Sequence, residues 1–187
     1  MSDVLPSLRF WILSMLVCSV AYPALLLGFA EALAPGSARG SLLRGAGGQV
    51  VGSALLAQQF EQPGYFWPRP SAAGYDASAT GGSNLSPASP ELAERVAASL
   101  AGLDAEGNRL VPADLVTASG SGMDPHLTRA AARYQVARVA SARGIAPERL
   151  DALIDTLAAD PGGGLGGDHL VNVLRLNLAL DRLSSGS

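Results

Sequence analysis

Three loops rich in glycine and serine hold most of the residues in this sequence that could do chemistry. They are GGSNL at residues 81–85, TASGSGMDPH at residues 117–126 and PGGGLGGDH at residues 161–169. The second loop has the clearest expected geometry, because the sequence predicts a strand before it and a helix after it. A glycine-rich turn that opens a helix can present main-chain N–H groups to an anion. The carboxylate of Asp124 would repel a phosphate there, so a simple strand-to-helix connection remains the alternative interpretation.

The second loop also contains the residue types of a serine hydrolase. Ser119 or Ser121 would be the nucleophile, His126 the base, and Asp124 the group that orients the base. The loop lacks the G-x-S-x-G pattern that presents such a serine on a sharp turn. His126 is equally well explained as a surface residue in the first turn of a helix. The residues therefore favour a subunit of a larger assembly over an enzyme.

The composition excludes several other kinds of chemistry. All 13 basic residues are arginine, so the sequence has no lysine for a Walker-type phosphate loop, a Schiff base or a Ser–Lys dyad. The single cysteine, Cys18, excludes an internal disulfide and a multi-cysteine zinc site. Asp168 and His169 are neighbours without a further ligand cluster, which gives a metal site little support. The net charge of −3 argues against binding to nucleic acid.

The N-terminal part of the chain has the composition of a membrane helix. Residues 10–30 contain no charged side chain, and Arg9 and Glu31 stand at the two ends of this run. At about 1.5 Å per residue a helix of this length spans roughly 30 Å, the thickness of the hydrocarbon core of a bilayer. Pro23 interrupts the run, and we expect it to kink the helix. The sequence therefore predicts a membrane anchor at residues 1–34.

Two alternatives to a retained anchor remain open. A cleaved signal peptide would end at Ala34, but the apolar run is longer than the roughly 7–15 residues of a signal core, and Pro35 follows directly. A lipoprotein would be anchored through Cys18, but Val17 precedes it where a small residue is needed. The arginines flanking the helix do not specify its orientation.

The remainder of the chain predicts a tether and one soluble domain. Residues 35–48 are rich in Gly, Ser and Ala and predict a flexible tether, and residues 49–187 are long enough to bury a core. The patterns predict a strand passing into a helix at 50–60, a helix at 90–100 capped by Ser89, a strand at 110–118, a helix at 125–143 capped by Asp124 and stopped by Gly144, a helix at 147–159, and a strand or turn leading into a final helix. The predicted fold class is α+β, with a single N-terminal transmembrane helix followed by one soluble α+β domain.

One arginine is expected on the apolar face of the helix at 125–143. A guanidinium there needs a carboxylate or carbonyl partner, and Asp114 and Asp124 are the candidates for Arg138. The alternative is that Arg138 lies along the rim with its charged end in water. We also expect Gly120 and Gly122 to have backbone conformations that a side chain would strain, with Arg138 supporting their loop.

Several segments resemble, in this order, the C subunit of the bacterial high-affinity potassium-transporting ATPase, the Kdp system. Together with the N-terminal anchor they extend over nearly the whole chain. The segments are GSALLAQQF from Gly52, YFWPRPSAAGYDA from Tyr65, GGSNL from Gly81, VPADLVTASGSGMDPH from Val111, Gln135 and Arg138 within YQVARVASARG, and VNVLRLNLAL from Val171.

The resemblance implies a non-catalytic, single-pass subunit of an ATP-driven potassium uptake pump. It places the chain in the bacterial inner membrane with its soluble domain outside the cytoplasm. The implied partners are a channel-like potassium-translocating subunit, a P-type ATPase subunit that carries out hydrolysis, and a small single-helix subunit. The implied role is that of a catalytic chaperone that raises the ATP affinity of the ATPase subunit. ATP and potassium then act on the complex, and no cofactor is assigned to this chain.

From the residues alone, a membrane-anchored extracytoplasmic hydrolase or an adhesive or scaffold domain remains the alternative. No residue is assigned to catalysis or to a metal. The candidate interface or loop-support residues are the polar and glycine positions of the resembling segments: Arg69, Ser71, Gly81, Gly82, Ser83, Asn84, Asp114, Thr117, Ser119, Gly120, Ser121, Gly122, Asp124, Gln135, Arg138, Asn172 and Asn177.

Overall fold

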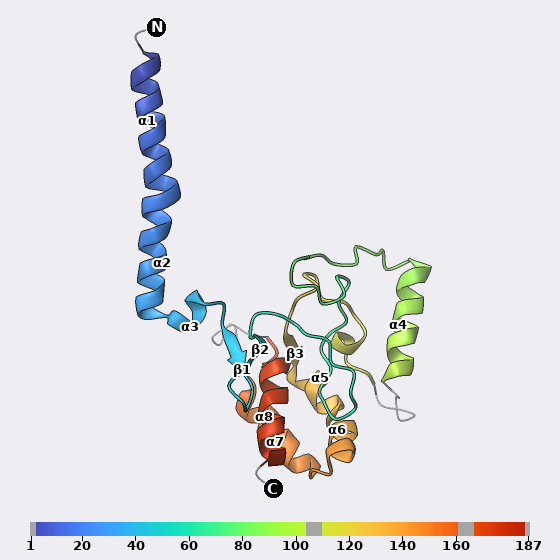
Figure 1. Cartoon of the computed structure of the whole chain (residues 1–187). Coiled ribbons are helices and arrows are strands. Elements are labelled where there is room, and N and C mark those ends of the chain that lie inside the picture. Colours follow the sequence, from blue (N-terminus) through green and yellow to red (C-terminus); the bar gives the residue numbers. More distant parts are fainter. Residues whose placement is uncertain (1–2, 104–109, 161–166, 186–187) are drawn as a thin grey trace. The chain divides into compact units, whose positions relative to one another are not determined.

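The computed structural model describes residues 3–103, 110–160 and 167–185, and the chain divides into two compact units, Met1–Leu42 and Leu43–Ser187 (Figure 1). The first unit is helical. Its elements are α1 (Val4–Leu16), the π-helical turn η1 (Val17–Ala21), α2 (Tyr22–Leu33) and α3 (Pro35–Ala38).

The first three of these elements form one continuous apolar helix, Val4–Leu33, which is long enough to cross a membrane. This confirms the predicted helix and extends it beyond Arg9 toward the N-terminus. In η1 the N–H of Tyr22 donates to the carbonyl of Val17, five residues back instead of four. Pro23 follows and has no N–H of its own, and the helical turn directly before it is a wider π-helical turn. None of the most apolar part of the helix is buried within the chain.

The segment predicted as a flexible tether contains regular structure. Residues 35–48 include α3 and strand β1 (Leu42–Arg44), which pairs with β2 (Val50–Ser53) in a two-stranded sheet. The N–H of Gly45 donates to the carbonyl of Gln49 at 3.0 Å and closes the turn between the strands. The boundary between the units therefore lies after Leu42, inside the predicted tether.

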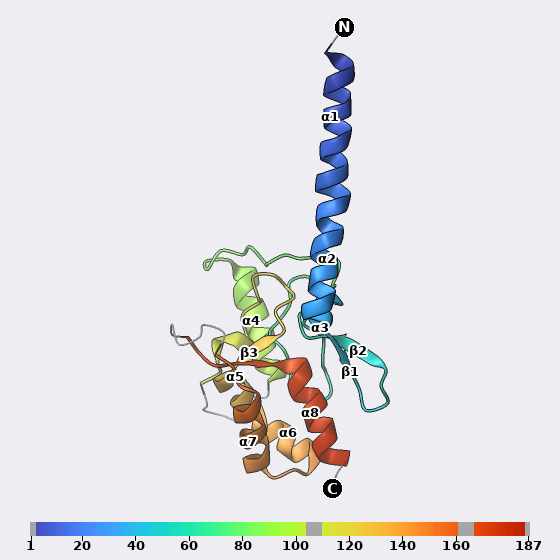
Figure 2. The same ribbon diagram turned by 90° about the vertical axis from the view of Figure 1, so that its left-hand side faces the viewer.

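The second unit combines helices with short strands, which confirms the α+β prediction. Helices α5 to α8 lie together in both views (Figure 2). The helices are α4 (Pro90–Gly102), α5 (Arg129–Tyr134), α6 (Val136–Arg143), α7 (Pro147–Leu157) and α8 (Val173–Ser185), with a 3-10 turn η2 (Ala113–Leu115) and strands β3 (His126–Thr128) and β4 (Leu170–Asn172). The apolar faces of α5 to α8, with β3, β4 and Phe66, form one core, whose largest fully buried apolar side chains are Phe66, Leu127, Leu150, Ile154, Leu176 and Leu180. α4 buries no residue.

The helix predicted at 125–143 is wrong at its start and is interrupted at Gln135. Residues 126–128 form β3, which pairs with β4 in antiparallel register, with Leu127 opposite Val171. The helix begins only at Arg129, where the hydroxyl of Thr128 accepts a hydrogen bond from Ala131 N–H at 3.2 Å. Pairing with a distant strand thus overrides the local signal of an Asp-Pro helix start.

Two other predicted elements are also wrong. No helix follows β2 in residues 54–60, because the Ser53 hydroxyl accepts from Leu55 N–H and turns the chain. The strand predicted at 110–118 is replaced by η2, which begins directly after Pro112. Proline has no N–H for a strand ladder, which favours the turn.

The other helical predictions are confirmed. α4 begins at Pro90 with Ser89 in the N-cap position, although the Ser89 side chain makes no cap hydrogen bond. α6 ends at Gly144, whose φ of +65° is the left-handed conformation that glycine provides at a helix end. α7 buries Leu150 and Ile154, and β4 leads directly into α8.

Candidate functional site

Two of the glycine- and serine-rich loops contact each other directly. We call residues 69–84 and 117–126 the loop cluster. The hydrogen bonds between its two segments include Ser119 N–H to the Pro70 carbonyl (3.1 Å), Gly81 N–H to the Ser121 carbonyl (2.9 Å), the Ser71 hydroxyl to the Gly122 carbonyl (2.6 Å) and the Thr80 hydroxyl to the Ser121 carbonyl (3.2 Å). Because all four of these acceptors are main-chain carbonyls, the path of the backbone largely determines how the two loops fit.

Glycine is required at one of the two predicted positions of the second loop. Gly122 has a φ of +72°, and a Cβ there would lie 2.8 Å from the Gly81 carbonyl oxygen and 2.9 Å from the Ala73 Cβ. At Gly120 a Cβ would meet nothing within 4 Å, and its φ is not in the left-handed region. The prediction is therefore right for Gly122 and wrong for Gly120.

Asp124 fixes the end of the second loop. Its carboxylate accepts from the main-chain N–H of His126 at 3.0 Å, lies 3.2 Å from Nδ1 of His126, and pairs with Arg69 at 3.4 Å. Hydrogen bonding to His126, more than the charge of Arg69, holds the pKa of Asp124 below its ordinary value. Asp124 is thus a turn and ion-pair residue, not the N-cap of a helix.

Acid should weaken the loop cluster through Asp124. Because its pKa is lowered in the folded chain, the ionised carboxylate stabilises the fold above the ordinary value of 3.8, and this contribution disappears as the pH falls through the lowered pKa. Asp124→Asn should therefore flatten the acid side of a plot of urea-unfolding midpoint against pH. Glu94→Gln is the matched control, since the Glu94 side chain is exposed and makes no hydrogen bond in the described part of the chain. Equal slopes for wild type and Asp124→Asn would contradict this assignment.

The hydrolase and anion-binding hypotheses find no support in this geometry. Ser119 is buried, and the Ser121 hydroxyl accepts from Met123 N–H at 3.1 Å. No hydrogen bond joins either serine to His126 in the described residues. The second loop leads into β3, so it does not open a helix whose N–H groups could hold an anion.

The third loop and its neighbours add no metal site to this picture. Residues 161–166 lie outside the described residues, so most of the PGGGLGGDH loop is not placed. Across the described ranges, no group of three His, Cys, Asp or Glu side chains could hold a metal ion. The carbonyl of His169 accepts from Arg129 N–H at 2.9 Å and extends the β3–β4 pairing.

Arg138 supports a different segment from the one that we predicted. Its guanidinium donates to the carbonyls of Pro63 (2.6 Å) and Tyr65 (3.0 Å) and to Oε1 of Gln135 (2.6 Å). It also lies over the ring of Trp67, 3.8 Å from the ring centroid. Neither Asp114 nor Asp124 is its partner, and carbonyl oxygens replace the expected carboxylate. The Arg138 side chain is half-buried and its donors are used on the strap and on Gln135, so its charged end does not lie free in water at the rim. Burial lowers the pKa of Arg138 to about 10.

We call residues 63–67 the strap, because side chains from the helices hold its main chain in place. The Gln135 amide bonds both the N–H (2.8 Å) and the carbonyl (3.0 Å) of Trp67. The Asn177 amide bonds both the N–H (2.9 Å) and the carbonyl (3.0 Å) of Phe66 in the same way. Both amides are only 2% exposed. Inside the core they satisfy the main-chain N–H and carbonyl groups that a neighbouring strand would otherwise bond.

Of the remaining candidate residues, Asp114 and Asn172 lie outside the loop cluster and the strap, whereas Thr117, Gly82, Ser83 and Asn84 belong to the loop cluster. The Asp114 carboxylate accepts from Thr128 N–H at 2.9 Å, and the Thr117 hydroxyl donates to the Ala113 carbonyl at 2.7 Å. Asn172 donates to the Ala54 carbonyl at 2.8 Å and accepts from Arg175 N–H in the first turn of α8. Gly82 approaches the Gly120 carbonyl, since a Cβ there would lie 3.0 Å from its oxygen. Ser83 is half-buried, and Asn84 is exposed with a φ of +51°.

Sequence reasoning missed residues that hold the strap and the 69–84 segment of the loop cluster. Arg143 donates to the Gly64 carbonyl and to Asp181, both at 2.8 Å, and lies over the ring of Tyr65. Tyr75 donates to the Arg69 carbonyl at 2.9 Å, and burial raises its pKa. The aromatic run at 65–67 was the available signal, because aromatic rings next to arginine-rich helices favour cation–π contacts.

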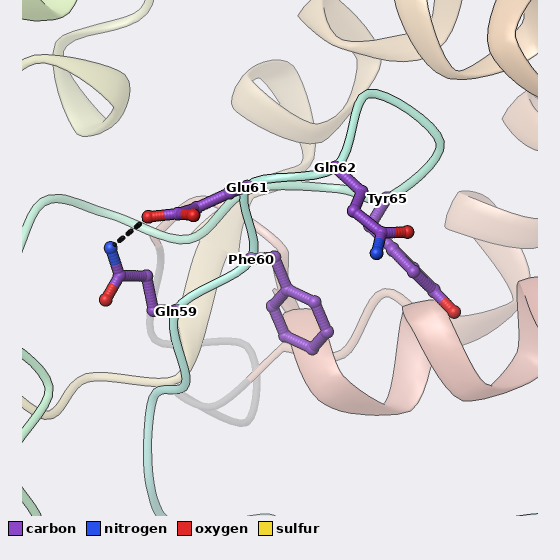
Figure 3. A pocket seen from close by; sticks show the side chains of 5 residues that line it. All are labelled: Gln59, Phe60, Glu61, Gln62 and Tyr65. Atoms are coloured by element: carbon purple, nitrogen blue, oxygen red, sulfur yellow. Dashed lines mark hydrogen bonds between the residues drawn. The ribbon is translucent and has the colours of Figure 1, made fainter.

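An open cleft lies beside the strap and is lined by Gln59, Phe60, Glu61, Gln62 and Tyr65, with a volume of about 340 Å³ (Figure 3). The rings of Phe60 and Tyr65 lie 5.5 Å apart at an angle of 43°. Glu61 points away from these rings and accepts from Gln59 at 2.7 Å. A second cleft of about 540 Å³ shares Gln62 and Tyr65 and reaches Arg143. Amides and aromatic rings therefore flank the strap over an extended surface.

Comparison with known proteins gives consistent matches over both units. The sequence profile of the family described as "KdpC: K+-transporting ATPase, c chain" matches residues 4–182. A protein of Parvibaculum lavamentivorans named potassium-transporting ATPase KdpC subunit is 46% identical over 185 residues, which cover 99% of each chain. Proteins of the same name from Myxococcus xanthus and Serratia proteamaculans are 50% and 47% identical, over 97% and 98% of this chain and 88% and 100% of the relatives.

Proposed function

The chain belongs to the KdpC family, the c chain of the K+-transporting ATPase, and from this premise we propose how it serves the pump. As a member of this family it is an accessory subunit of a potassium pump. We infer that it binds no substrate itself, that hydrolysis takes place in a partner subunit, and that this chain raises the affinity of that partner for ATP.

The proposed arrangement has one helix in the bacterial inner membrane and the second unit outside the cytoplasm. Its partners are a channel-like potassium-translocating subunit, a P-type ATPase subunit and a small single-helix subunit. The observation that carries this proposal is the extent of the family match. Residues 4–182 include both the apolar helix and the folded unit, so both belong to what the family has in common. The unburied helix supports assembly with other membrane helices, which would cover its side chains.

We infer that the effect on ATP affinity is indirect. Gln135 and Asn177 have polar side chains that could bind a nucleotide, but both are buried and their amides are hydrogen-bonded to the strap. The exposed surfaces available to partners are the clefts beside the strap and the outer edge of the loop cluster, where Asn84 is exposed. Contacts there would act by favouring one conformation of the partner complex.

Removing this subunit should abolish ATP-driven potassium uptake. A strain without the chain should fail to grow at micromolar potassium, and a tagged chain should copurify from detergent with larger membrane proteins. If the chaperone role is correct, a complex that lacks the chain should have a higher KM for ATP, and adding the chain back should lower it.

Each result separates one part of the proposal from the others. Copurification without a change in the KM for ATP would support the role in assembly and would contradict the chaperone role. A mature chain that begins near Leu33 or Pro35 after intact-mass measurement would contradict the retained anchor. Labelling of Ser119 or Ser121 by a fluorophosphonate probe would favour a hydrolase instead.

A further inference from the structure

A polar site lies at the middle of the apolar helix, in the turn before Pro23. In a regular α-helix the N–H of Tyr22 would donate to the carbonyl of Cys18, four residues back. Here that N–H donates to the carbonyl of Val17 instead, and Pro23 has no N–H to give. The carbonyl of Cys18 therefore lacks the main-chain donor that a regular helix would supply.

The hydroxyl of Ser19 is a second polar group in the same turn. Ser14, earlier in the helix, donates its hydroxyl to the Trp11 carbonyl at 2.9 Å, which is a common way to satisfy a helical serine. Within the described residues, Ser19 has no such side-chain hydrogen bond. Cys18 and Ser19 are both exposed, so no other part of the described chain covers them.

The surroundings of this turn offer no hydrogen-bond donor. The helix has 30 residues and is about 45 Å long, whereas the hydrocarbon core of a bilayer is about 30 Å thick. A turn at the middle of the helix therefore lies deep in the hydrocarbon. Lipid tails cannot satisfy a carbonyl or a hydroxyl there, so the missing donor must come from protein.

We propose that the Cys18–Ser19 turn is the contact site for a transmembrane helix of another pump subunit, which carries a donor side chain such as Ser, Thr, Asn or Gln at this depth. The partner side chain donates to the Cys18 carbonyl and exchanges a hydrogen bond with the Ser19 hydroxyl. The small side chains of Cys18 and Ser19 allow the partner backbone to approach closely. This inference rests on the proposed function, which surrounds the helix with other membrane subunits.

The sequence allows a direct test, because Cys18 is its only cysteine. A chain grown on [1-13C]cysteine carries one labelled carbonyl, at this position. Solid-state NMR would compare the labelled chain alone in bilayers with the same chain assembled with unlabelled partner subunits. We expect the carbonyl resonance to move downfield on assembly. Pro23→Ala calibrates the measurement, because it allows a regular helix in which the N–H of Tyr22 donates to the Cys18 carbonyl, and this bond should move the resonance downfield in the chain alone.

A resonance that stays unchanged on assembly would overturn the proposal. A bonded resonance in the wild-type chain alone would also overturn it, since a second copy or the chain itself would then supply the donor. Ser19→Ala should weaken copurification by about threefold, whereas Ser14→Ala should have no effect, because its hydroxyl bonds inside its own helix. Equal effects of the two variants would contradict the proposal. If the wild-type chain recovers no partner at all, the proposed function fails; normal recovery with an unchanged resonance contradicts this inference alone.

Discussion

Gly122→Val should lower the free energy of unfolding by about 3 kcal/mol and should sharply reduce pump activity. Two costs add at this position. A valine would have to adopt a φ of +72°, which β-branched residues rarely do. Its Cβ would also lie 2.8 Å from the carbonyl oxygen of Gly81, an atom of the backbone that cannot rotate away. The loop cluster would have to open, which would displace the exposed edge near Asn84.

Gly120→Val is the matched control, because it makes the same substitution two residues earlier in the same loop. A Cβ at Gly120 would meet nothing within 4 Å, so we expect the stability of Gly120→Val to remain close to that of the wild type. Urea-unfolding midpoints of the detergent-solubilised chain, followed by tryptophan fluorescence, measure both variants. Equal losses in the two variants would contradict the geometry of the loop cluster. A stable Gly120→Val chain that fails to support growth would instead assign this position to a partner contact.

Arg138→Ala should cost about 3 kcal/mol of the free energy of unfolding. The substitution removes the donors to the carbonyls of Pro63 and Tyr65 and to Oε1 of Gln135, and it uncovers one face of Trp67. The strap keeps its bonds to Gln135, Asn177 and Arg143, but the carbonyls of Pro63 and Tyr65 lose their side-chain donor. The strap should loosen, and the two clefts beside it should lose their shape.

Two further substitutions make this result specific. Arg138→Lys keeps the charge but not the planar set of donors, so it should recover only part of the stability. Arg129→Ala removes an arginine that lies 3.7 Å from Asp155 at the surface, and it should cost about 0.5 kcal/mol. Wild-type stability in Arg138→Ala would contradict the role of the strap contacts. A stable but inactive Arg138→Ala pump would place this arginine at a partner interface.

The elements that could be predicted from the sequence are those with local signals. The apolar helix, α4, α7 and the stop at Gly144 each depend on a run of apolar residues, a proline at a helix start or a glycine at a helix end. β3 could not be predicted, because residues 126–128 become a strand only by pairing with β4, which is far away in the sequence. The Asp-Pro pair before it is an ordinary start of a helix, and this local signal was misleading.

The candidate site could be predicted in part for a similar reason. The glycine- and serine-rich loops were identified, but which glycine is constrained depends on the approach of Gly81 and Ala73 from another segment. The need of Arg138 for a partner followed from its expected burial, whereas the partners themselves are main-chain carbonyls of the strap. Main-chain acceptors have no residue type, so no sequence pattern identifies them.

Gln135 and Asn177 hold the strap through its main chain. The residues that folding requires are therefore different from the strap side chains that a partner would contact. Each amide bonds the N–H and the carbonyl of a single strap residue, and the Gln135 amide also accepts from Arg138, so none of these bonds uses a side chain of the strap. The identity of the two amides is therefore fixed by folding, while the outward-facing side chains of the strap and its clefts can change without breaking these bonds. Such a surface can evolve together with its partner subunit, residue by residue, at little cost to the stability of the domain.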